Sequence, residues 1–309
     1  QTSTVTVTAV NDTPVLGGLG GSVSYTENGT GTVIDSSITL TDADDTQISG
    51  AVIQITAGLT TGDLLNFTDQ LGITGSYVAG TGTLTLTGTT SIANYITALQ
   101  SITFSSSSED PTNNNSATSR TISWTVTDAN SDAVGAQTST PQTSTVTVTA
   151  VNDTPVVTAG ATLSYTENGT AAVIDATITI NDADDTQITG ATVTISSVVA
   201  GDVLSFVDTG TITGVYNAGT GVLTLTGTDT LANYQAALRS ITYHSTSEDP
   251  TVDTTRPTRT VTWAVTDANS DAVGAQTSSG VTSTINLTAT ADTPVLGGLG
   301  GSVSYTENG

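Results

Sequence analysis

The sequence has no cysteine and no methionine, and its four basic residues are all arginine. Without cysteine the chain can form no disulfide framework, no thiol nucleophile and no thiolate metal site. No apolar run approaches the roughly 18 residues that a membrane-crossing helix needs, so we expect no membrane insertion in this segment. The chemistry that remains is that of oxygen in hydroxyls, amides and carboxylates.

The shortage of positive charge leaves the chain strongly acidic. Against four arginines stand 28 acidic residues, which gives a formal net charge of −24. Such a surface repels phosphate backbones and anionic lipid headgroups, so nucleic acid is excluded as an expected partner. The same surface attracts cations.

A repeat of about 140 residues organises the chain. Val10-Asn11-Asp12-Thr13-Pro14 returns as Val151-Asn152-Asp153-Thr154-Pro155 and, altered, as Thr290-Ala291-Asp292-Thr293-Pro294. The proline cannot continue a sheet ladder, so we expect one module to end there and the next to begin. The expected parts are the end of a preceding repeat (1–13), two repeats (14–153 and 154–292) and the start of a third (293–309). We expect the chain to be a segment of a longer array.

Within each repeat, apolar and hydroxylated residues alternate in short runs, which indicates strands with one buried face. In the first repeat the pattern predicts strands near 22–26, 32–41, 47–57, 63–68, 73–78, 83–87, 101–106, 119–127 and 143–150. The side chains expected to point inward are Val23, Tyr25, Val33, Ile38, Leu40, Val52, Ile53 and Ile55. A glycine-rich turn predicts a hairpin over 77–84.

One helix interrupts the strands of each repeat. Ile92, Tyr95, Ile96 and Leu99 form a helical stripe behind a Thr90/Ser91 cap, and the second repeat repeats the stripe over 231–238 behind Asp229. Trp124 and Trp263 lie beside inward aliphatic residues, which favours core packing over ligand stacking. The fold class predicted is all-β, with tandem antiparallel β-sandwich modules that each carry one short helix.

Acidic residues gather where the predicted strands end. Alternating strand directions place one set at one pole of the first repeat and another at the opposite pole of the second; these are Glu27, Glu109, Asp110 and Asp153, then Asp182, Asp184, Asp185 and Asp267. End-to-end stacking would bring both sets together, where they repel one another unless cations lie between them. Oxygen ligands without histidine or cysteine favour Ca²⁺, which takes about six to eight oxygens, over Mg²⁺, which retains its waters.

Five short motifs resemble the calcium motifs of cadherin repeats: Tyr-Thr-Glu-Asn, Thr-Asp-Ala-Asp, Ser-Glu-Asp-Pro, Val-Thr-Asp-Ala-Asn and Val-Asn-Asp-Thr-Pro. The repeats are more closely similar to the cadherin-like tandem repeats of giant bacterial surface adhesins, which are often secreted by type I systems. Residues 231–243, 247–250 and 261–267 carry this similarity, and it covers essentially the whole chain. The resemblance implies a cadherin/Ig-like sandwich, an extracellular location at the cell surface and folding after export, where calcium is abundant.

The resemblance also implies a set of metal ligands. They are Asn11, Asp12, Glu27, Asp42, Asp44, Glu109, Asp110, Asp128, Asn152, Asp153, Glu167, Asp182, Asp184, Glu248, Asp249, Asp267 and Asp292. Ser-Glu-Asp-Pro departs from the cadherin Asp-Arg-Glu, so it stays open whether Glu109 or Asp110 binds. Ala291 replaces the linker asparagine, which removes at most one carbonyl ligand from the third junction.

Other calcium patterns fit less well. The stretch that begins at Asp42 lacks the glycine and the glutamate that an EF-hand loop has at its sixth and twelfth positions. The glycine-rich stretch 17–21 resembles a β-roll nonapeptide but contains no aspartate. Asp132 and Asp271 are expected to be ordinary turn residues.

The sequence predicts no enzyme. The one histidine, His244, is replaced by Ser105 at the equivalent position of the first repeat, and the paired carboxylates that a glycosidase would need recur once per repeat, as scaffolding does. The predicted function is a structural extender of a cell-surface adhesin, rigidified by Ca²⁺ at the junctions, whose partners are neighbouring repeats of the same chain. The alternatives are a self-associating filament or sheath, with other copies as partners, and a Ca²⁺-dependent carbohydrate-binding module. A threonine array such as 83–87 could also face sugar or ice.

Overall fold

The computed structural model describes all residues except 132, 295, 298–299, 302–306 and 308–309. It divides into two compact units. Unit one comprises Gln1–Val156, Asn181–Ile188 and Thr266–Ser278, and unit two comprises Val157–Ile180, Thr189–Val265 and Ser279–Gly309. Two acidic segments of the second sequence repeat therefore belong to unit one. The described part of the predicted third repeat adds no strand or helix.

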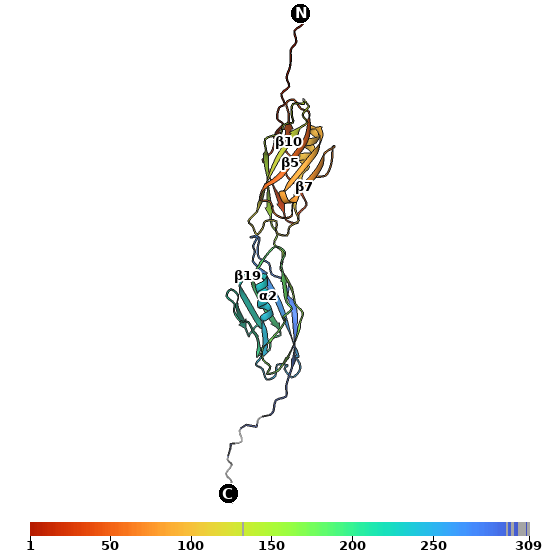
Figure 1. Cartoon of the computed structure of the whole chain (residues 1–309). Coiled ribbons are helices and arrows are strands. Elements are labelled where there is room, and N and C mark those ends of the chain that lie inside the picture. Colours follow the sequence, from red (N-terminus) through yellow and green to blue (C-terminus); the bar gives the residue numbers. More distant parts are fainter. Residues whose placement is uncertain (132, 295, 298–299, 302–306, 308–309) are drawn as a thin grey trace. The chain divides into compact units, whose positions relative to one another are not determined.

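The first repeat folds as two facing sheets. Its elements are β1 (Val15–Gly17), β2 (Ser22–Thr26), β3 (Thr32–Val33), β4 (Thr39–Thr41), β5 (Gln47–Ala57), β6 (Asp63–Asn66), β7 (Thr74–Val78), η1 (Ala79–Thr81), β8 (Thr83–Ser91), α1 (Ile92–Gln100), β9 (Thr103–Ser106), β10 (Ser119–Asp128) and β11 (Gln142–Thr149). One sheet has the order β2-β11-β10-β5-β8-β7, with β5, β7 and β10 labelled in Figure 1, and the other has the order β3-β9-β6. Strand β1 pairs with β4.

The second repeat has the same topology. Its elements are β12 (Val156–Thr158), β13 (Thr162–Thr166), β14 (Ala172–Val173), β15 (Thr179–Asn181), β16 (Gln187–Ser196), β17 (Asp202–Ser205), β18 (Thr213–Asn217), β19 (Val222–Thr230), α2 (Leu231–Ser240), β20 (Thr242–Ser245), β21 (Thr258–Asp267) and β22 (Val281–Thr288). Its two larger sheets have the orders β13-β22-β21-β16-β19-β18 and β14-β20-β17, and β12 pairs with β15. The predicted fold class is confirmed, and one edge pair in each repeat, β2–β11 or β13–β22, is parallel. Among the described residues, no helix is both long and apolar enough to cross a membrane.

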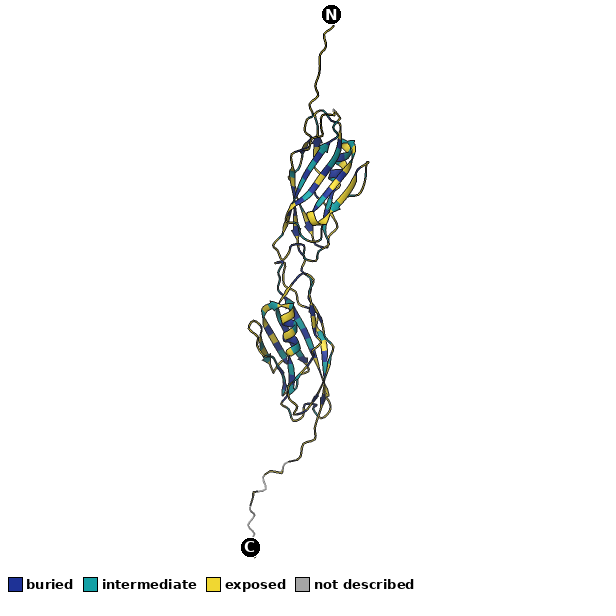
Figure 2. Cartoon of the chain, in the orientation of Figure 1, coloured by how far each residue is buried: buried dark blue, intermediate teal, exposed yellow. Residues whose placement is uncertain are grey.

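Alternating burial along the strands produces the core, as the banding in Figure 2 shows. Tyr25 packs edge-on against Phe104, with ring centroids 5.3 Å apart. Trp124 and Trp263 are 1% and 0% exposed, which confirms their predicted place in the core. The indole nitrogen of Trp263 donates to Ser283 at 3.0 Å.

Two kinds of local prediction were wrong: which residues of a strand face inward, and how far one strand extends. Val33 and Val52 are each 40% exposed, because successive strand residues face opposite sides and Ile34 and Ile53 take the inward positions. The predicted strand 32–41 is broken around Asp35, whose buried carboxylate accepts hydrogen bonds from the backbone and hydroxyl of Ser37. This local bonding competes with the sheet ladder.

The predicted hairpin and helices are confirmed in outline. Gly82, in the left-handed conformation, closes the turn between β7 and β8. Ser91 caps α1 by accepting from the backbone of Asn94. The cap of α2 is Thr230 rather than Asp229, since Thr230 accepts the backbone N–H of Asn233 at 3.2 Å, whereas Asp229 accepts that residue's side-chain amide.

Each repeat contains a fully buried ion pair that the sequence did not reveal. Arg120 binds Asp63 at 2.6 Å and Arg259 binds Asp202 at 2.7 Å, with all four side chains at 0% exposure. Arg120 also donates to the carbonyl of Pro111 at 2.6 Å. Because Pro111 directly follows Glu109 and Asp110, the pair ties an acidic loop to the core.

Breaking the second pair should destabilise unit two strongly. Arg259→Met leaves Asp202 buried without its counter-charge, and we expect a loss of about 3–5 kcal/mol of unfolding free energy. The exposed neighbour Arg256 provides the matched control, since Arg256→Met should cost less than about 0.5 kcal/mol. Urea unfolding in a Trp124→Phe background, followed by the fluorescence of Trp263, measures both. Equal losses in the two variants would contradict the role of the pair.

Candidate metal-binding sites

The parallel pairing of β2 with β11 brings two predicted ligands together. Thr26 lies opposite Thr149, and the next residue, Glu27, donates its backbone N–H to the Thr149 carbonyl at 2.9 Å. Its carboxylate accepts from the backbone of Val151 at 2.8 Å. Oxygens of Glu27, Glu109 and Asp153 all lie within 4.8 Å of one another.

The linker residue Asn152 connects to the second sequence repeat within unit one. Its side-chain amide donates to Asp267 at 3.0 Å and to the Gly274 carbonyl at 2.6 Å. The backbone of Asp153 donates to Asp184 at 3.0 Å. We call the resulting group the central acidic cluster; it comprises Glu27, Glu109, Asn152, Asp153, Asp182, Asp184 and Asp267.

Between Glu109 and Asp110, the structure brings only Glu109 into the group with Glu27 and Asp153. The carboxylate of Asp110 turns to its own loop, where it accepts from the backbone of Asn114 at 2.9 Å.

The amino-terminal linker repeats part of this arrangement. The side chain of Asn11 donates to Asp128 at 3.0 Å and to the Gly135 carbonyl at 2.7 Å, and the backbone of Asp12 donates to Asp44 at 3.1 Å. An open pocket of about 500 Å³ lies beside Asp12 and Asp42. We call this group the amino-terminal acidic cluster; it comprises Asn11, Asp12, Asp42, Asp44 and Asp128.

Unit two carries a third copy of the carboxylate group. Oxygens of Glu167, Glu248 and Asp292 lie within 4.8 Å of one another, and Glu167 accepts from the backbone of Thr290 at 2.7 Å. As with Asp110, Asp249 instead accepts a backbone N–H within its own loop, from Asp253 at 2.8 Å. The same geometry therefore occurs in both units.

Buried oxygens without a hydrogen-bond donor distinguish these clusters from ordinary turns. In the clusters defined above they are Asn11 Oδ1, Glu27 Oε1, Asp42 Oδ2, Asn152 Oδ1, Glu167 Oε1, Asp182 Oδ2 and Asp184 Oδ1. A buried acceptor left unpaired costs about 1–3 kcal/mol, and more when charged. By contrast, the buried carboxylate of Asp35 receives donors from Ser37 and Ser144. These donor-free oxygens come from asparagine, aspartate and glutamate side chains, and such oxygen ligands match the preferences of Ca²⁺.

The electrostatics of the central cluster disfavour bare negative charge. Burial raises the pKa of Glu27 to about 7, with smaller contributions from Asp153 and Glu109. Burial and the neighbouring Asp182 raise the pKa of Asp184 to about 8. For Asp35 burial also raises the pKa, but hydrogen bonds from Ser37, Ser144 and the backbone of Gly21 together outweigh it and lower the pKa. The negative charge of these carboxylates is therefore unfavourable unless a bound cation or a proton compensates it.

Three acids depart from the sequence prediction. Asp271 is 6% exposed and accepts a hydrogen bond from Thr112, so it is not an ordinary exposed turn residue. Asp45 and Asp185, each 4% exposed, lie outside the predicted ligand set, although each has a buried oxygen without a donor. The available signal for Asp45 and Asp185 was the Asp-Ala-Asp-Asp run at 42–45 and 182–185, and that for Asp271 was the Asp-Ala-Asn-Ser-Asp motif. Asp132 lies outside the described residues.

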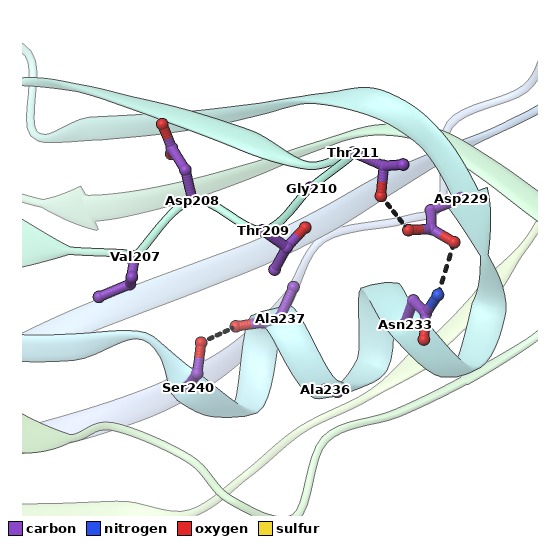
Figure 3. A pocket seen from close by; sticks show the side chains of 10 residues that line it. All are labelled: Val207, Asp208, Thr209, Gly210, Thr211, Asp229, Asn233, Ala236, Ala237 and Ser240. Carbon is purple, nitrogen blue, oxygen red and sulfur yellow. Dashed lines mark hydrogen bonds between the residues drawn. The ribbon is translucent and has the colours of Figure 1, made fainter.

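Another pocket, in unit two, has an open volume of about 720 Å³ (Figure 3). Its polar groups are bonded within the protein: Asp229 accepts from Thr211 and Asn233, and Ser240 donates to the Ala237 carbonyl. His244 does not line it and is partly exposed on β20.

The raised pKa of Glu27 predicts how stability depends on pH in the absence of calcium. Because the folded pKa of about 7 exceeds the ordinary value of 4.5, the folded state holds the proton more tightly. The unfolding free energy of unit one should therefore fall, by roughly 2 kcal/mol, as pH rises from 4.5 to 7. Chelator-treated protein unfolded in urea across this range tests the slope. Glu27→Gln should reduce it, and a slope unchanged by this substitution would refute the assignment.

Comparisons with known proteins give one match in sequence and several in structure. Halomucin of Haloquadratum walsbyi is 37% identical over 108 residues, which are 33% of this chain; the chain spans about 1% of the length of that curated relative. No family model matches. The fold is similar to human protocadherin-24 EC1-2 (12% identity, TM-score 0.34, 91% and 100% of the two chains covered) and to mouse cadherin-23 EC22-24 (12%, 0.33, 90% and 67%). It is also similar to human mucin-like protocadherin EC1-2 (13%, 0.32, 89% and 99%).

Proposed function

We propose that this chain is a calcium-stiffened structural extender of an extracellular adhesin, built from tandem β-sandwich repeats. The observation that carries the proposal is the convergence of Glu27, Glu109 and Asp153 within 4.8 Å, beside buried oxygens that have no donor. The triad recurs around Glu167, as expected for a device that is used once per repeat.

The central acidic cluster offers two groups of ligands. Glu27, Glu109 and Asp153 would hold one ion. The free oxygens of Asn152, Asp182 and Asp184, with Asp267 beside them, would hold another. A bound ion would neutralise carboxylates that otherwise repel one another, and the linker would become rigid because its own residues are ligands.

The kind of ion follows from the same chemistry, and the location follows from the family resemblance. Extracellular modules bind Ca²⁺ with dissociation constants of about 10⁻⁴–10⁻³ M, which millimolar calcium fills. The motifs resemble those of cadherin-like repeats in bacterial surface adhesins, and we place the protein at a cell surface on that resemblance. The repeat boundaries proposed are 14–153 and 154–292, with 1–13 and 293–309 belonging to neighbouring repeats.

Other roles have less support. A carbohydrate site would need unsatisfied polar groups in a pocket, whereas those of the pocket in Figure 3 are bonded within the protein. Self-association has one favourable feature, since Val215 on the edge strand β18 is 73% exposed. We propose no catalytic role.

Calcium binding should stabilise and stiffen the chain. At 100 times the dissociation constant, calcium should add about 2.7 kcal/mol per site to the unfolding free energy. Asp153→Ala and Asp184→Ala should reduce this gain while the sandwiches stay folded. In small-angle scattering, wild type should become more extended in calcium than in chelator.

The matched control is Asp253→Asn. Asp253 is exposed, lies outside the predicted ligands and occupies the position that Asn114 has in the first repeat. The substitution Asp253→Asn removes one negative charge, and the variant should keep the full calcium response. If calcium changed neither the melting temperature nor the maximum dimension of wild type, the proposed function would be wrong.

A further inference from the structure

The loop that follows Glu109 contains a turn of left-handed backbone, and neither repeat uses glycine for it. In residues 113–115, all asparagine, φ is 52°, 53° and 61°. In residues 252–254 of the second repeat, which are valine, aspartate and threonine, φ is 50°, 51° and 66°. Left-handed backbone is unfavourable for L-residues, and β-branched residues adopt it least readily, so it is seldom used at successive positions. Since the side chains of the two turns differ, we attribute their common conformation to the contacts that both loops share.

The carboxylate before each turn supplies the first shared contact. Asp110 Oδ1 accepts the backbone N–H of Asn114 at 2.9 Å, and its Oδ2 accepts the side-chain amide of the same residue at 3.0 Å. Asp249 Oδ2 accepts the backbone N–H of Asp253 at 2.8 Å, and its Oδ1 accepts the hydroxyl of Thr251 at 3.1 Å. All four oxygens therefore have a donor in the protein, in contrast to the donor-free oxygens of the acidic clusters.

A threonine and a buried arginine hold the other side of the turn. The hydroxyl of Thr112 accepts the backbone N–H of Asn115 at 3.1 Å, and the Thr112 carbonyl accepts that of Ala117 at 2.7 Å. The carbonyl of Pro111 accepts from Arg120 at 2.6 Å. The equivalent residues of the second repeat make the same three bonds, at 3.3, 2.8 and 2.6 Å. Both turns are thus fastened to the core of their own sandwich.

These bonds restrain the backbone on both sides of Glu109. After it, the backbone is held by the turn and by the buried arginine. Across it, the hydroxyl of Ser108 accepts the backbone N–H of Asp110 at 3.1 Å. The second repeat has the same bridge across Glu248, also at 3.1 Å. Glu109 and Glu248 are themselves exposed, so burial does not fix their positions and the backbone of the loop does. A ligand that is already ordered loses less conformational entropy on binding, so this restraint favours ion binding.

We propose that Asp110 is a positioning residue and not a metal ligand. It holds the left-handed turn, and the turn keeps Glu109 directed at the carboxylates of Glu27 and Asp153, whose oxygens lie within 4.8 Å of its own. The equivalent aspartate of the second repeat, Asp249, has the same role. The inference rests on the proposed function, because directing Glu109 matters only where a cation binds. It deepens that function by separating, within each Glu-Asp pair, the residue that binds from the residue that aims it.

Two substitutions of Asp110 test this role, because both remove the same charge and only one removes the acceptor. Asp110→Asn keeps an oxygen for the backbone N–H of Asn114, and Asp110→Ala does not. In the calcium-free intact chain, the amide of Asn114 should exchange with solvent about tenfold faster in the alanine variant, as expected for one lost hydrogen bond. In a calcium titration followed by NMR at Asn28, next to Glu27, the alanine variant should also need about tenfold more calcium than the asparagine variant.

Crystals of the wild-type chain grown with calcium test the ligand assignment separately. An oxygen of Glu109 should lie about 2.3–2.6 Å from an ion, while the Asp110 carboxylate stays on Asn114. Asp253→Asn, in the turn of unit two, removes one charge and should leave the titration unchanged. Circular dichroism checks folding, and should Asp110→Ala unfold, Ser108→Ala opens the bridge across Glu109 and should likewise raise the calcium needed.

The outcomes separate this inference from the proposed function. If the two Asp110 variants need equal calcium, or if Asp110 binds an ion in the crystal, the positioning role is wrong. The proposed function then stands as long as Glu109→Gln weakens calcium binding. If wild type binds no calcium, both proposals fail.

Discussion

The structure depends on how a chain with 28 acidic and four basic residues neutralises the carboxylates that it buries. Inside each sandwich it uses an arginine, as in the Arg120–Asp63 pair, which is completely buried. Near the strand ends it uses hydroxyl and backbone donors, as around Asp35. In the acidic clusters backbone donors reach only some of the carboxylate oxygens, as Val151 does with Glu27, and others such as Glu27 Oε1 stay unpaired. A buried anion without a partner is costly, and this cost is the physical argument for the cation that we propose there.

The same buried ion pair also links the core to the site. The guanidinium of Arg120 binds Asp63 on β6 and, at the same time, the carbonyls of Pro111 and Ala117 in the loop after β9. That loop carries Glu109, and it also carries Thr112, which bonds to Asp271. The acidic loop therefore has a rigid base, and a ligand bound there would act on an element already fixed to the sandwich. Arg259 makes the corresponding bond to Pro250 in the second repeat.

The sequence predicted much of this arrangement because its patterns are local. Strand periodicity located β5 and β10, and the helical stripe located α1, since each signal depends on neighbouring residues only. It failed where two aliphatic residues stand side by side: Val52 and Ile53 cannot both face inward, and composition alone does not select between them. It also failed at Asp35, where hydrogen bonds from Ser37 interrupt a strand that the hydrophobic pattern continues.

By itself the sequence determined the repeat period, the all-β class and the acidity, because these follow from composition and spacing, and its resemblance to cadherin repeats predicted a list of cation ligands. Only the tertiary structure decided which acids meet. It placed Glu109 rather than Asp110 beside Glu27 and Asp153, gave the arginines to Asp63 and Asp202, and buried Asp271 against Thr112. The physical reason is that oxygens from loops more than 100 residues apart in sequence become neighbours only when sheet register and loop paths are set together.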